Sequence, residues 1–252
     1  MKFPALDFSD GADVHVWHID LATSGIADFV DMFSADEIKR RDGFFFDRDR
    51  DRYTRARMAM RCILSAYLGV LAGDVKFGVG PHGKPFLAGF ASSRSLQFNI
   101  THSGNLALLA LSGEAAVGID VEMLRRPDDI RSLAKSVFSI AENAQFATLS
   151  DEALVAAFFS CWTQKEAVLK ALGTGLSIDA RCIDVGFDVA HKKITVPSSC
   201  AQQAISVRTI LQNDAAIASL AVVGNFGGVM HFDYSKPVFD TIINKLNVEN
   251  QR

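Results

Sequence analysis

The sequence FSADE at residues 33–37 has a counterpart, FSIAE, at residues 138–142. In each copy a Ser is followed three residues later by a Glu, which is the capping box that begins many helices. A segment with apolar residues at helical spacing follows each box, from about residue 48 to 68 and from about residue 152 to 172. Both segments end in Leu-Gly, and Gly is the usual residue just past a helix end. The repeat predicts a duplicated α+β unit, although two ordinary capped helices could also coincide by chance.

Seven strands are expected from β-branched and alternating patterns, and they would give each half a small sheet beside its long helix. They are Asp13–Ile19, Ser95–Thr101, Leu106–Ser112, Ala116–Glu122, Cys182–Val189, Ala204–Leu211 and Ala216–Val223. The predicted fold class is therefore α+β with two similar halves. We expect an N-terminal half over residues 1–114, a C-terminal half over residues 115–229, and a C-terminal extension over residues 230–252 that forms a short helix or frays.

The bulk composition indicates a globular protein without a broad anion-binding surface. The chain has 252 residues, 49% of them apolar, and a formal net charge of -3, which gives no general attraction for nucleic acid or an anionic membrane. Its start lacks the basic leader and apolar run of a signal peptide, and no long uncharged stretch predicts a membrane span. The four Cys residues are far apart and match neither a zinc nor a disulfide pattern. A cytoplasmic protein with reduced thiols is expected.

Two carboxylates lie close together in the sequence VGIDVE, residues 117–122. In a strand, alternate side chains point to one face, so Asp120 and Glu122 would lie side by side. Such a pair repels itself unless it is protonated or neutralised by a cation, and this suggests a metal site. A solvated strand end is the simpler explanation when the motif is considered alone.

Three further stretches contain candidate functional residues. Glu166 and Lys170 lie four residues apart on one helical face, where they could form an ordinary ion pair. The stretch GPHGKPFL at residues 80–87 is a turn whose Gly83 permits close approach of a ligand and whose Lys84 is positively charged. The stretch FNITHSG at residues 98–104 ends a predicted strand. Its anion donors would be Asn99, Thr101 and His102, although a lone His is more often structural.

In this order along the chain, the motifs resemble those of the large, Sfp-type 4'-phosphopantetheinyl transferases. The resemblance covers about residues 34–176 and includes a basic block at residues 44–61. It also includes the motifs GKP, FNITHS, GIDVE, FS and WTQKEAVLK, which start at residues 83, 98, 118, 138 and 162.

The resemblance implies two α+β halves related by pseudo-twofold symmetry, with coenzyme A and Mg²⁺ in the cleft between them. It places the metal on Asp120, Glu122 and Glu166, whose hard oxygens suit magnesium. The implied coenzyme A contacts are Arg48, Lys84, Pro85, Asn99, Thr101, His102, Asp120 and Lys170. Among these, Lys170 and His102 would contact phosphates, and Arg48 and Lys84 would lie near the nucleotide end and its 3'-phosphate.

The implied activity is that of a holo-[acyl-carrier-protein] synthase. A serine of an apo acyl or peptidyl carrier protein would attack the phosphorus next to pantetheine, and adenosine 3',5'-bisphosphate would leave. Glu166 and Lys170 are the expected catalytic residues, with Glu166 as general base and Glu142 as a second candidate that is more simply a helix cap. A pseudo-dimeric chain favours a monomer, and no nucleic acid or membrane partner is expected.

Two rival functions remain open from the sequence. One is a noncatalytic module that binds coenzyme A and a carrier without modifying it, which the complete carboxylate set disfavours. The other is a metal-dependent phosphotransferase or pyrophosphate hydrolase acting on nucleotides, although the chain has no Walker-type phosphate loop. The carrier and its pathway are not specified by the sequence.

Overall fold

The computed structural model describes residues 13–22, 27–89, 96–196 and 203–235. Two long helices, α2 (Asp47–Leu68) and α5 (Leu154–Leu172), are accompanied by shorter ones, α1 (Ala35–Asp42), α3 (Ile130–Val137) and α4 (Ile140–Ala147). The strands are β1 (Val14–Asp20), β2 (Phe77–Val79), β3 (Pro85–Leu87), β4 (Gln97–Ser103), β5 (Leu106–Ser112), β6 (Val117–Met123), β7 (Lys192–Val196), β8 (Gln203–Gln212), β9 (Ala216–Val223) and β10 (Val229–Tyr234).

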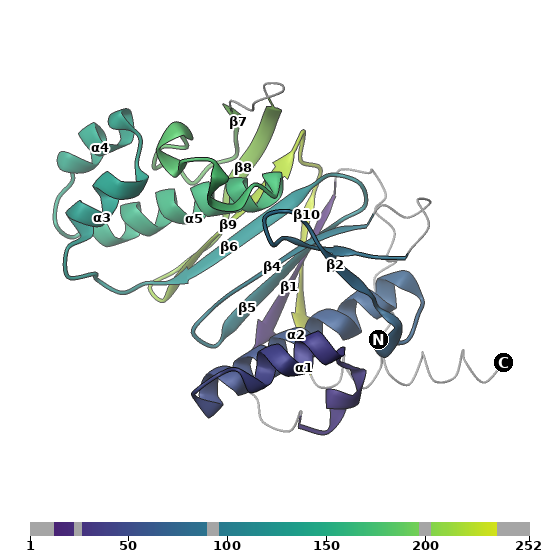
Figure 1. Cartoon of the computed structure of the whole chain (residues 1–252). Coiled ribbons are helices and arrows are strands. Elements are labelled where there is room, and N and C mark those ends of the chain that lie inside the picture. Colours follow the sequence, from purple (N-terminus) through teal and green to yellow (C-terminus); the bar gives the residue numbers. More distant parts are fainter. Residues whose placement is uncertain (1–12, 23–26, 90–95, 197–202, 236–252) are drawn as a thin grey trace.

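Two four-stranded sheets lie between two helical layers (Figure 1). One sheet has the order β10-β1-β5-β4 and is covered by α2, while the other has the order β6-β9-β8-β7 and is covered by α5. A third apolar layer, with Val14, Leu108, Ile119 and Leu220 among its fully buried members, fills the space between the sheets. The two sheets are thus joined by a continuous core, and most of the fold's apolar area is buried in these three layers.

The strand orders of the two sheets correspond. In each sheet the first strand of the half, β1 or β6, pairs antiparallel with the second strand of a later hairpin, β5 or β9. That strand pairs in turn with the first strand of its hairpin, β4 or β8. This agreement supports the predicted duplication of an α+β unit.

Both predicted capping boxes are confirmed, as is the termination of the long helices. The hydroxyls of Ser34 and Ser139 accept hydrogen bonds from the amides of Glu37 and Glu142, at 3.3 and 3.1 Å. Gly69 and Gly173 end α2 and α5 in the left-handed conformation, with φ of 69° and 67°. Six predicted strands correspond to β1, β4, β5, β6, β8 and β9, apart from their end residues.

The strand predicted over residues 182–189 is wrong, because the backbone groups there bond to buried side chains instead of a neighbouring strand. The ammonium of Lys165 donates to the carbonyls of Ala180 and Ile183, and Glu142 accepts from the amides of Val185 and Gly186. A short 3-10 turn (Ala180–Cys182) and irregular backbone take the place of the strand.

The C-terminal extension also needs a correction. Residues 230–234 belong to β10, which pairs in parallel with β1 from Val14↔Val229 to Ile19↔Tyr234. The chain therefore returns from the second half to complete the sheet of the first half. Residues 236–252, including the expected short helix, lie outside the described residues. The boundary between the halves near residue 114 stays a prediction.

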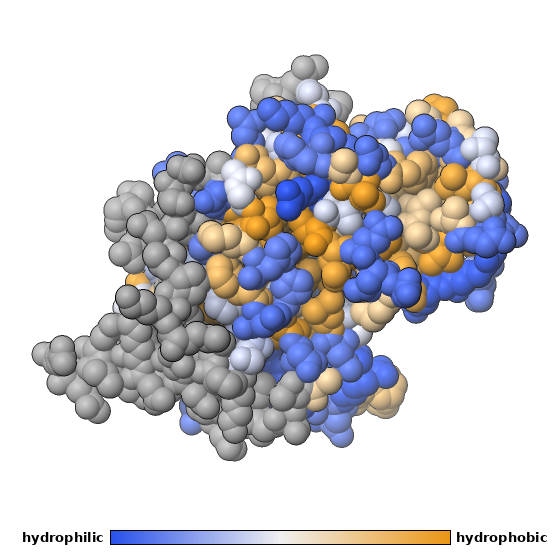
Figure 2. All heavy atoms as spheres, turned by 180° about the vertical axis from the view of Figure 1, so that it is seen from behind, coloured by the Kyte–Doolittle hydropathy of each residue, from blue (hydrophilic) through white to orange (hydrophobic). Residues whose placement is uncertain are grey.

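One face of the molecule shows mixed hydrophilic and apolar areas (Figure 2). Seen from behind, apolar residues gather near the middle of the face, where hydrophilic residues separate them into patches (Figure 2). Among the described segments, no helix has both the length and the hydrophobicity to cross a bilayer.

Candidate active site

Strands β4 and β6 are edge strands of different sheets, and side chains of β4 bond to the backbone edge of β6. The side-chain oxygen of Asn99 accepts from the amide of Ile119 at 2.9 Å, and the hydroxyl of Ser103 accepts from the amide of Met123 at 3.1 Å. The Ser103 hydroxyl also donates to Glu122 Oε2 at 3.0 Å. These bonds satisfy the amides of Ile119 and Met123, which lie on the edge of β6 that faces β4. They also fix the position of the strand that bears both carboxylates.

A glycine brings β6 against α5. A Cβ atom added to Gly118 would lie 2.1 Å from the carbonyl oxygen of Ala167 and 2.2 Å from the amide nitrogen of Ala171. No other residue type fits at such a separation. Gly118 therefore allows the backbone of β6 to contact α5 directly. This contact places Asp120 opposite Lys170.

Asp120 and Lys170 form the ion pair at the centre of the site. The Lys170 ammonium lies 2.6 Å from Asp120 Oδ1 and 3.3 Å from the hydroxyl of Thr101, which donates to the same carboxylate oxygen at 3.1 Å. Asp120 is only 5% exposed, and its other oxygen, Oδ2, is buried and has no hydrogen-bond partner among the residues that the structure describes. A buried carboxylate oxygen without a partner is costly, so Oδ2 is suited to accept a cation or a donor from a ligand.

Negative charge accumulates around Asp120. Burial raises the pKa of Asp120 to about 6, against the opposing charge of Lys170 and with a further contribution from Glu122 and Glu166. Burial likewise raises the pKa of Glu166, with Lys170 opposing and Glu122 adding to the effect. The three predicted metal ligands therefore lie within electrostatic range of one another, and a cation would favour their ionised forms.

The donor set fits a magnesium ion in its chemistry, since all three groups are carboxylates and Asp120 Oδ2 lacks a partner. Within the described ranges, however, no three His, Cys, Asp or Glu side chains are gathered closely enough to hold a metal ion. Lys170 occupies the position next to Asp120 Oδ1. The metal assignment of Asp120, Glu122 and Glu166 therefore stays a prediction.

Further cations lie near His102. Loss of water around the ring lowers the pKa of His102, and the charges of Lys170, Arg52 and Arg40 lower it further. Arg52 donates twice to the side-chain oxygen of Asn105, in the turn between β4 and β5, at 3.0 and 2.7 Å. The side of the site formed by α2 and β4 is thus electropositive, which suits phosphate groups.

Lys84 lies at the junction between the halves. Its ammonium donates to the carbonyl of Val117, at the start of β6, at 3.0 Å and to that of Ala171, in α5, at 3.2 Å. Burial lowers the pKa of Lys84 to about 8. Pro85 follows as the first residue of β3. Arg48, in contrast, is largely exposed on α2 and pairs with Asp49 at 3.2 Å, so the structure gives it no contact with the other predicted residues.

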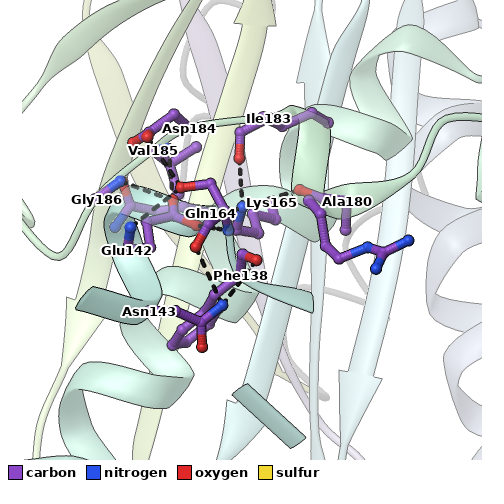
Figure 3. A network of polar contacts seen from close by, with 12 residues as sticks. Phe138, Glu142, Asn143, Gln164, Lys165, Ala180, Ile183, Asp184, Val185 and Gly186 are labelled. Carbon is purple, nitrogen blue, oxygen red and sulfur yellow. Dashed lines mark hydrogen bonds and ion pairs between the residues drawn. The ribbon is translucent and has the colours of Figure 1, made fainter. Parts of the chain in front are cut away.

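Glu142, the second candidate for a general base, is fully enclosed in a polar network (Figure 3). One of its oxygens accepts from the amides of Val185 and Gly186 at 2.8 and 3.0 Å, and the other lies 2.7 Å from the Lys165 ammonium. Hydrogen bonds from Lys165 hold the pKa of Glu142 below its ordinary value, although burial acts in the opposite direction. With all of these partners it is a structural residue, which leaves Glu166 as the candidate base.

Ser103, Gly118 and Arg52 lie within the sequence motifs, but the motifs alone predict no role for them. The positions of Ser103 and Arg52 depend on pairing between distant segments, which local patterns do not show. Gly118 could have been noticed, since a Gly inside a strand pattern often marks close approach of another backbone.

Comparisons with known proteins identify the family of this chain. The model of the 4'-phosphopantetheinyl transferase superfamily matches residues 116–219, and the model named 4'-phosphopantetheinyl transferase, N-terminal, matches residues 22–114. The chain is 38% identical over 216 residues to the 4'-phosphopantetheinyl transferase HetI of Nostoc sp., covering 84% of this chain and 88% of that protein. It is 41% identical over 116 residues to AcpT of Salmonella typhi, a 4'-phosphopantetheinyl transferase, covering 46% of this chain and 57% of that one. A 4'-phosphopantetheinyl transferase of Bacillus subtilis is 28% identical over 165 residues, with coverages of 65% and 71%.

Proposed function

The chain belongs to the 4'-phosphopantetheinyl transferase superfamily, and we propose that it uses a magnesium ion bound by Asp120, Glu122 and Glu166 for the reaction of that family. It transfers the 4'-phosphopantetheine moiety of coenzyme A to a serine of an apo carrier protein, giving the holo carrier and adenosine 3',5'-bisphosphate. The observation that supports the metal best is the buried carboxylate of Asp120, whose Oδ2 has no hydrogen-bond partner among the described residues and whose pKa is raised in part by Glu122 and Glu166.

Each side chain of the site would have a different role in the reaction. Lys170, already 2.6 Å from Asp120, would donate to phosphate oxygens as charge develops on them. A bound magnesium ion would supply additional positive charge to the pyrophosphate. Arg40 and Arg52, whose charges act on His102, would make this side of the site electropositive, and His102 could contact a phosphate as a neutral ring. Glu166, with its raised pKa, would accept the proton of the carrier serine.

The metal assignment predicts strict dependence on a divalent cation. Protein treated with excess chelator should transfer nothing, and addition of Mg²⁺ should restore the full rate. Asp120→Asn should lose most activity at saturating Mg²⁺, whereas Asp233→Asn, which changes an exposed acid on β10, should keep it. Full activity in excess chelator would show that the assignment of these carboxylates to a metal is wrong.

The coenzyme A contacts are proposed for the cleft between the two halves, with Lys84, Pro85, Asn99, Thr101 and His102 along it. If Arg48 and Lys84 lie near the 3'-phosphate, Arg48→Ala or Lys84→Ala should weaken binding of coenzyme A more than of dephospho-coenzyme A, because only the former has that phosphate. Titration calorimetry with both ligands measures this difference. Equal losses for the two ligands would place these residues elsewhere.

The cytoplasmic location and the monomeric state stay predictions. Transfer predicts that adenosine 3',5'-bisphosphate forms only when an apo carrier is present. Hydrolysis of coenzyme A would form it without a carrier, and binding without reaction would not form it at all.

A further inference from the structure

A buried ion-pair network connects α1 to α2 in the first half. Glu37, 4% exposed, bonds to Arg57 and lies 2.7 Å from the guanidinium of Arg61, which is 2% exposed. Glu37 also accepts from the amide of Ser34 at 2.7 Å, as part of the capping box. The partners of the carboxylate therefore fix both arginine side chains on the face of α2.

The two arginines contact the chain just before and within the β2–β3 hairpin. Arg61 Nη1 donates to the carbonyls of Ala72 and Val75 at 2.7 and 2.9 Å. The guanidinium carbons of Arg57 and Arg61 lie 4.6 and 5.1 Å from the centre of the Phe77 ring, which is in β2. The base of the hairpin is thus fixed to α2 by hydrogen bonds and by two cation–π contacts.

The hairpin is short, and its contacts with the core of the first half are made by Phe77 and Leu87 at its base. Each strand has three residues, and two of the side chains, Val79 and Phe86, are 71% and 51% exposed. A two-stranded hairpin of this size is marginal in water. Its tip contacts the second half through Lys84, whose ammonium bonds to β6 and α5. The tip therefore lies beside the strand and the helix that bear Asp120, Glu166 and Lys170.

We infer that Glu37, Arg57 and Arg61 are positioning residues for coenzyme A, because they fix the base of the hairpin whose tip contains Lys84 and Pro85. This inference rests on the proposed placement of those two residues at the coenzyme A site. The network does not touch the reacting groups. Its expected effect is on the affinity for coenzyme A, since a hairpin held in the bound conformation loses less entropy on binding.

The second half contains a counterpart that serves as a control. Glu142 and Lys165 form a buried pair at 2.7 Å, and Lys165 donates to the carbonyls of Ala180 and Ile183, as Figure 3 shows. Arg61 and Lys165 both lie eight residues before the glycine that ends their helix, Gly69 or Gly173. The carbonyl partners of Lys165 lie in the segment after α5 and not in the hairpin.

The correspondence between Arg61 and Lys165 suggests a conservative substitution, Arg61→Lys. Lys165 shows that one buried ammonium can satisfy a Glu and two carbonyls. A lysine at position 61 would keep the charge but lacks the planar guanidinium that lies over Phe77. The fold should therefore remain, while the base of the hairpin is held less firmly.

The experiment compares Arg61→Lys and Glu37→Asp with Glu142→Asp, which shortens the equivalent carboxylate. Coenzyme A affinity is measured by titration calorimetry without a carrier, and KM, kcat and the unfolding midpoint are measured in parallel. Arg61→Lys and Glu37→Asp should raise both Kd and KM for coenzyme A by about fivefold and change kcat at saturating coenzyme A by less than about twofold. Glu142→Asp should lower the unfolding midpoint but leave the Kd for coenzyme A within about twofold.

Unchanged affinity in Arg61→Lys and Glu37→Asp, or an equal loss in Glu142→Asp, would overturn the positioning role. If the wild-type protein binds coenzyme A but transfers nothing, only the proposed transferase function is wrong. The comparison of Kd values among the variants would still test the role of Glu37, Arg57 and Arg61. Wild-type protein that does not bind coenzyme A would overturn both.

Discussion

At the scale of single residues, the site depends on a lysine and an aspartate from elements far apart in the chain. Lys170 and Asp120 are 50 residues apart and meet at 2.6 Å. The sequence predicted both as site residues through the family's motifs. It could not predict that they form an ion pair, nor that Asn99 and Ser103 bond to the edge of β6, because these contacts depend on how the two sheets approach each other.

Lys170→Ala should lower kcat by roughly 100-fold to 1000-fold, the range found when one preorganised donor to a developing charge is removed. The KM for the carrier should change little, because Lys170 pairs with the buried Asp120 and is itself only partly exposed. Initial rates at saturating coenzyme A and Mg²⁺ measure the effect. Lys193→Ala, which changes an exposed lysine on β7, is the matched control and should be neutral. A Lys170→Ala enzyme with wild-type kcat would remove this residue from the catalytic group.

At the scale of elements, local signals predicted the helices well and the pairings of strands poorly. The capping boxes and the Leu-Gly ends determine where α1, α2, α4 and α5 begin or end. In contrast, β10 pairs with β1 about 215 residues away, and no local pattern indicates such a partner. Residues 182–189 have a strand-like pattern, but the buried Lys165 and Glu142 take their backbone bonds.

The direct contact between β6 and α5 gives a prediction for Gly118→Ala. The added methyl group would meet α5 backbone atoms at 2.1 and 2.2 Å, so the helix or the strand must move. Overpacking of this kind should lower the free energy of unfolding by about 1–3 kcal/mol. Separation of Asp120 from Lys170 should reduce kcat on the order of 100-fold.

Urea unfolding and initial rates measure the two effects of Gly118→Ala. Gly43→Ala is the matched control, since its Cβ would have its nearest neighbour at 3.4 Å and its φ is -76°. It should change neither quantity appreciably. If Gly118→Ala were as stable and active as wild type, the close contact between β6 and α5 would not be needed for the site.

The loop and helix after β6 form a candidate docking element for the carrier. Arg125 and Arg126 lie in the loop, and Arg131 at the start of α3 pairs with Asp151 at 3.5 Å. Nearby apolar side chains are exposed, with Leu133 at 45% and Ile140 at 93%. The family resemblance implies that this region lies near the carrier, and a basic, partly apolar surface would be complementary to a carrier that is acidic around its modified serine. A solvated loop is the alternative.

Replacement of both Arg125 and Arg126 by Glu should therefore raise the KM for the carrier several-fold and leave coenzyme A affinity nearly unchanged. The difference from wild type should shrink as salt rises, because exposed charges are screened over about 8–10 Å near physiological ionic strength. Steady-state kinetics at several salt concentrations measure both effects. If the double variant had the same KM for the carrier as the wild-type enzyme at low salt, the loop would be simply solvated and would have no role in docking.

At the scale of the whole molecule, the two halves would contribute different parts of the candidate site. The first half would supply β4, the hairpin, Arg40 of α1 and Arg52 of α2, while the second half would supply β6 and α5 with the carboxylates and Lys170. The repeated capping box and helix end predicted two similar halves from the sequence. The edge-to-edge arrangement of β4 and β6, which creates the site, depends on the packing of the core between the sheets and could not be predicted locally.

The most direct test of the proposed function is the mass of apo carrier proteins after incubation with this protein, coenzyme A and Mg²⁺. We predict that at least one carrier from a panel of acyl and peptidyl carriers gains the mass of one phosphopantetheine group on a serine. Adenosine 3',5'-bisphosphate should appear in equal amount. Neither product should form in excess chelator. No gain in mass by any carrier, while the protein still binds coenzyme A, would contradict the account.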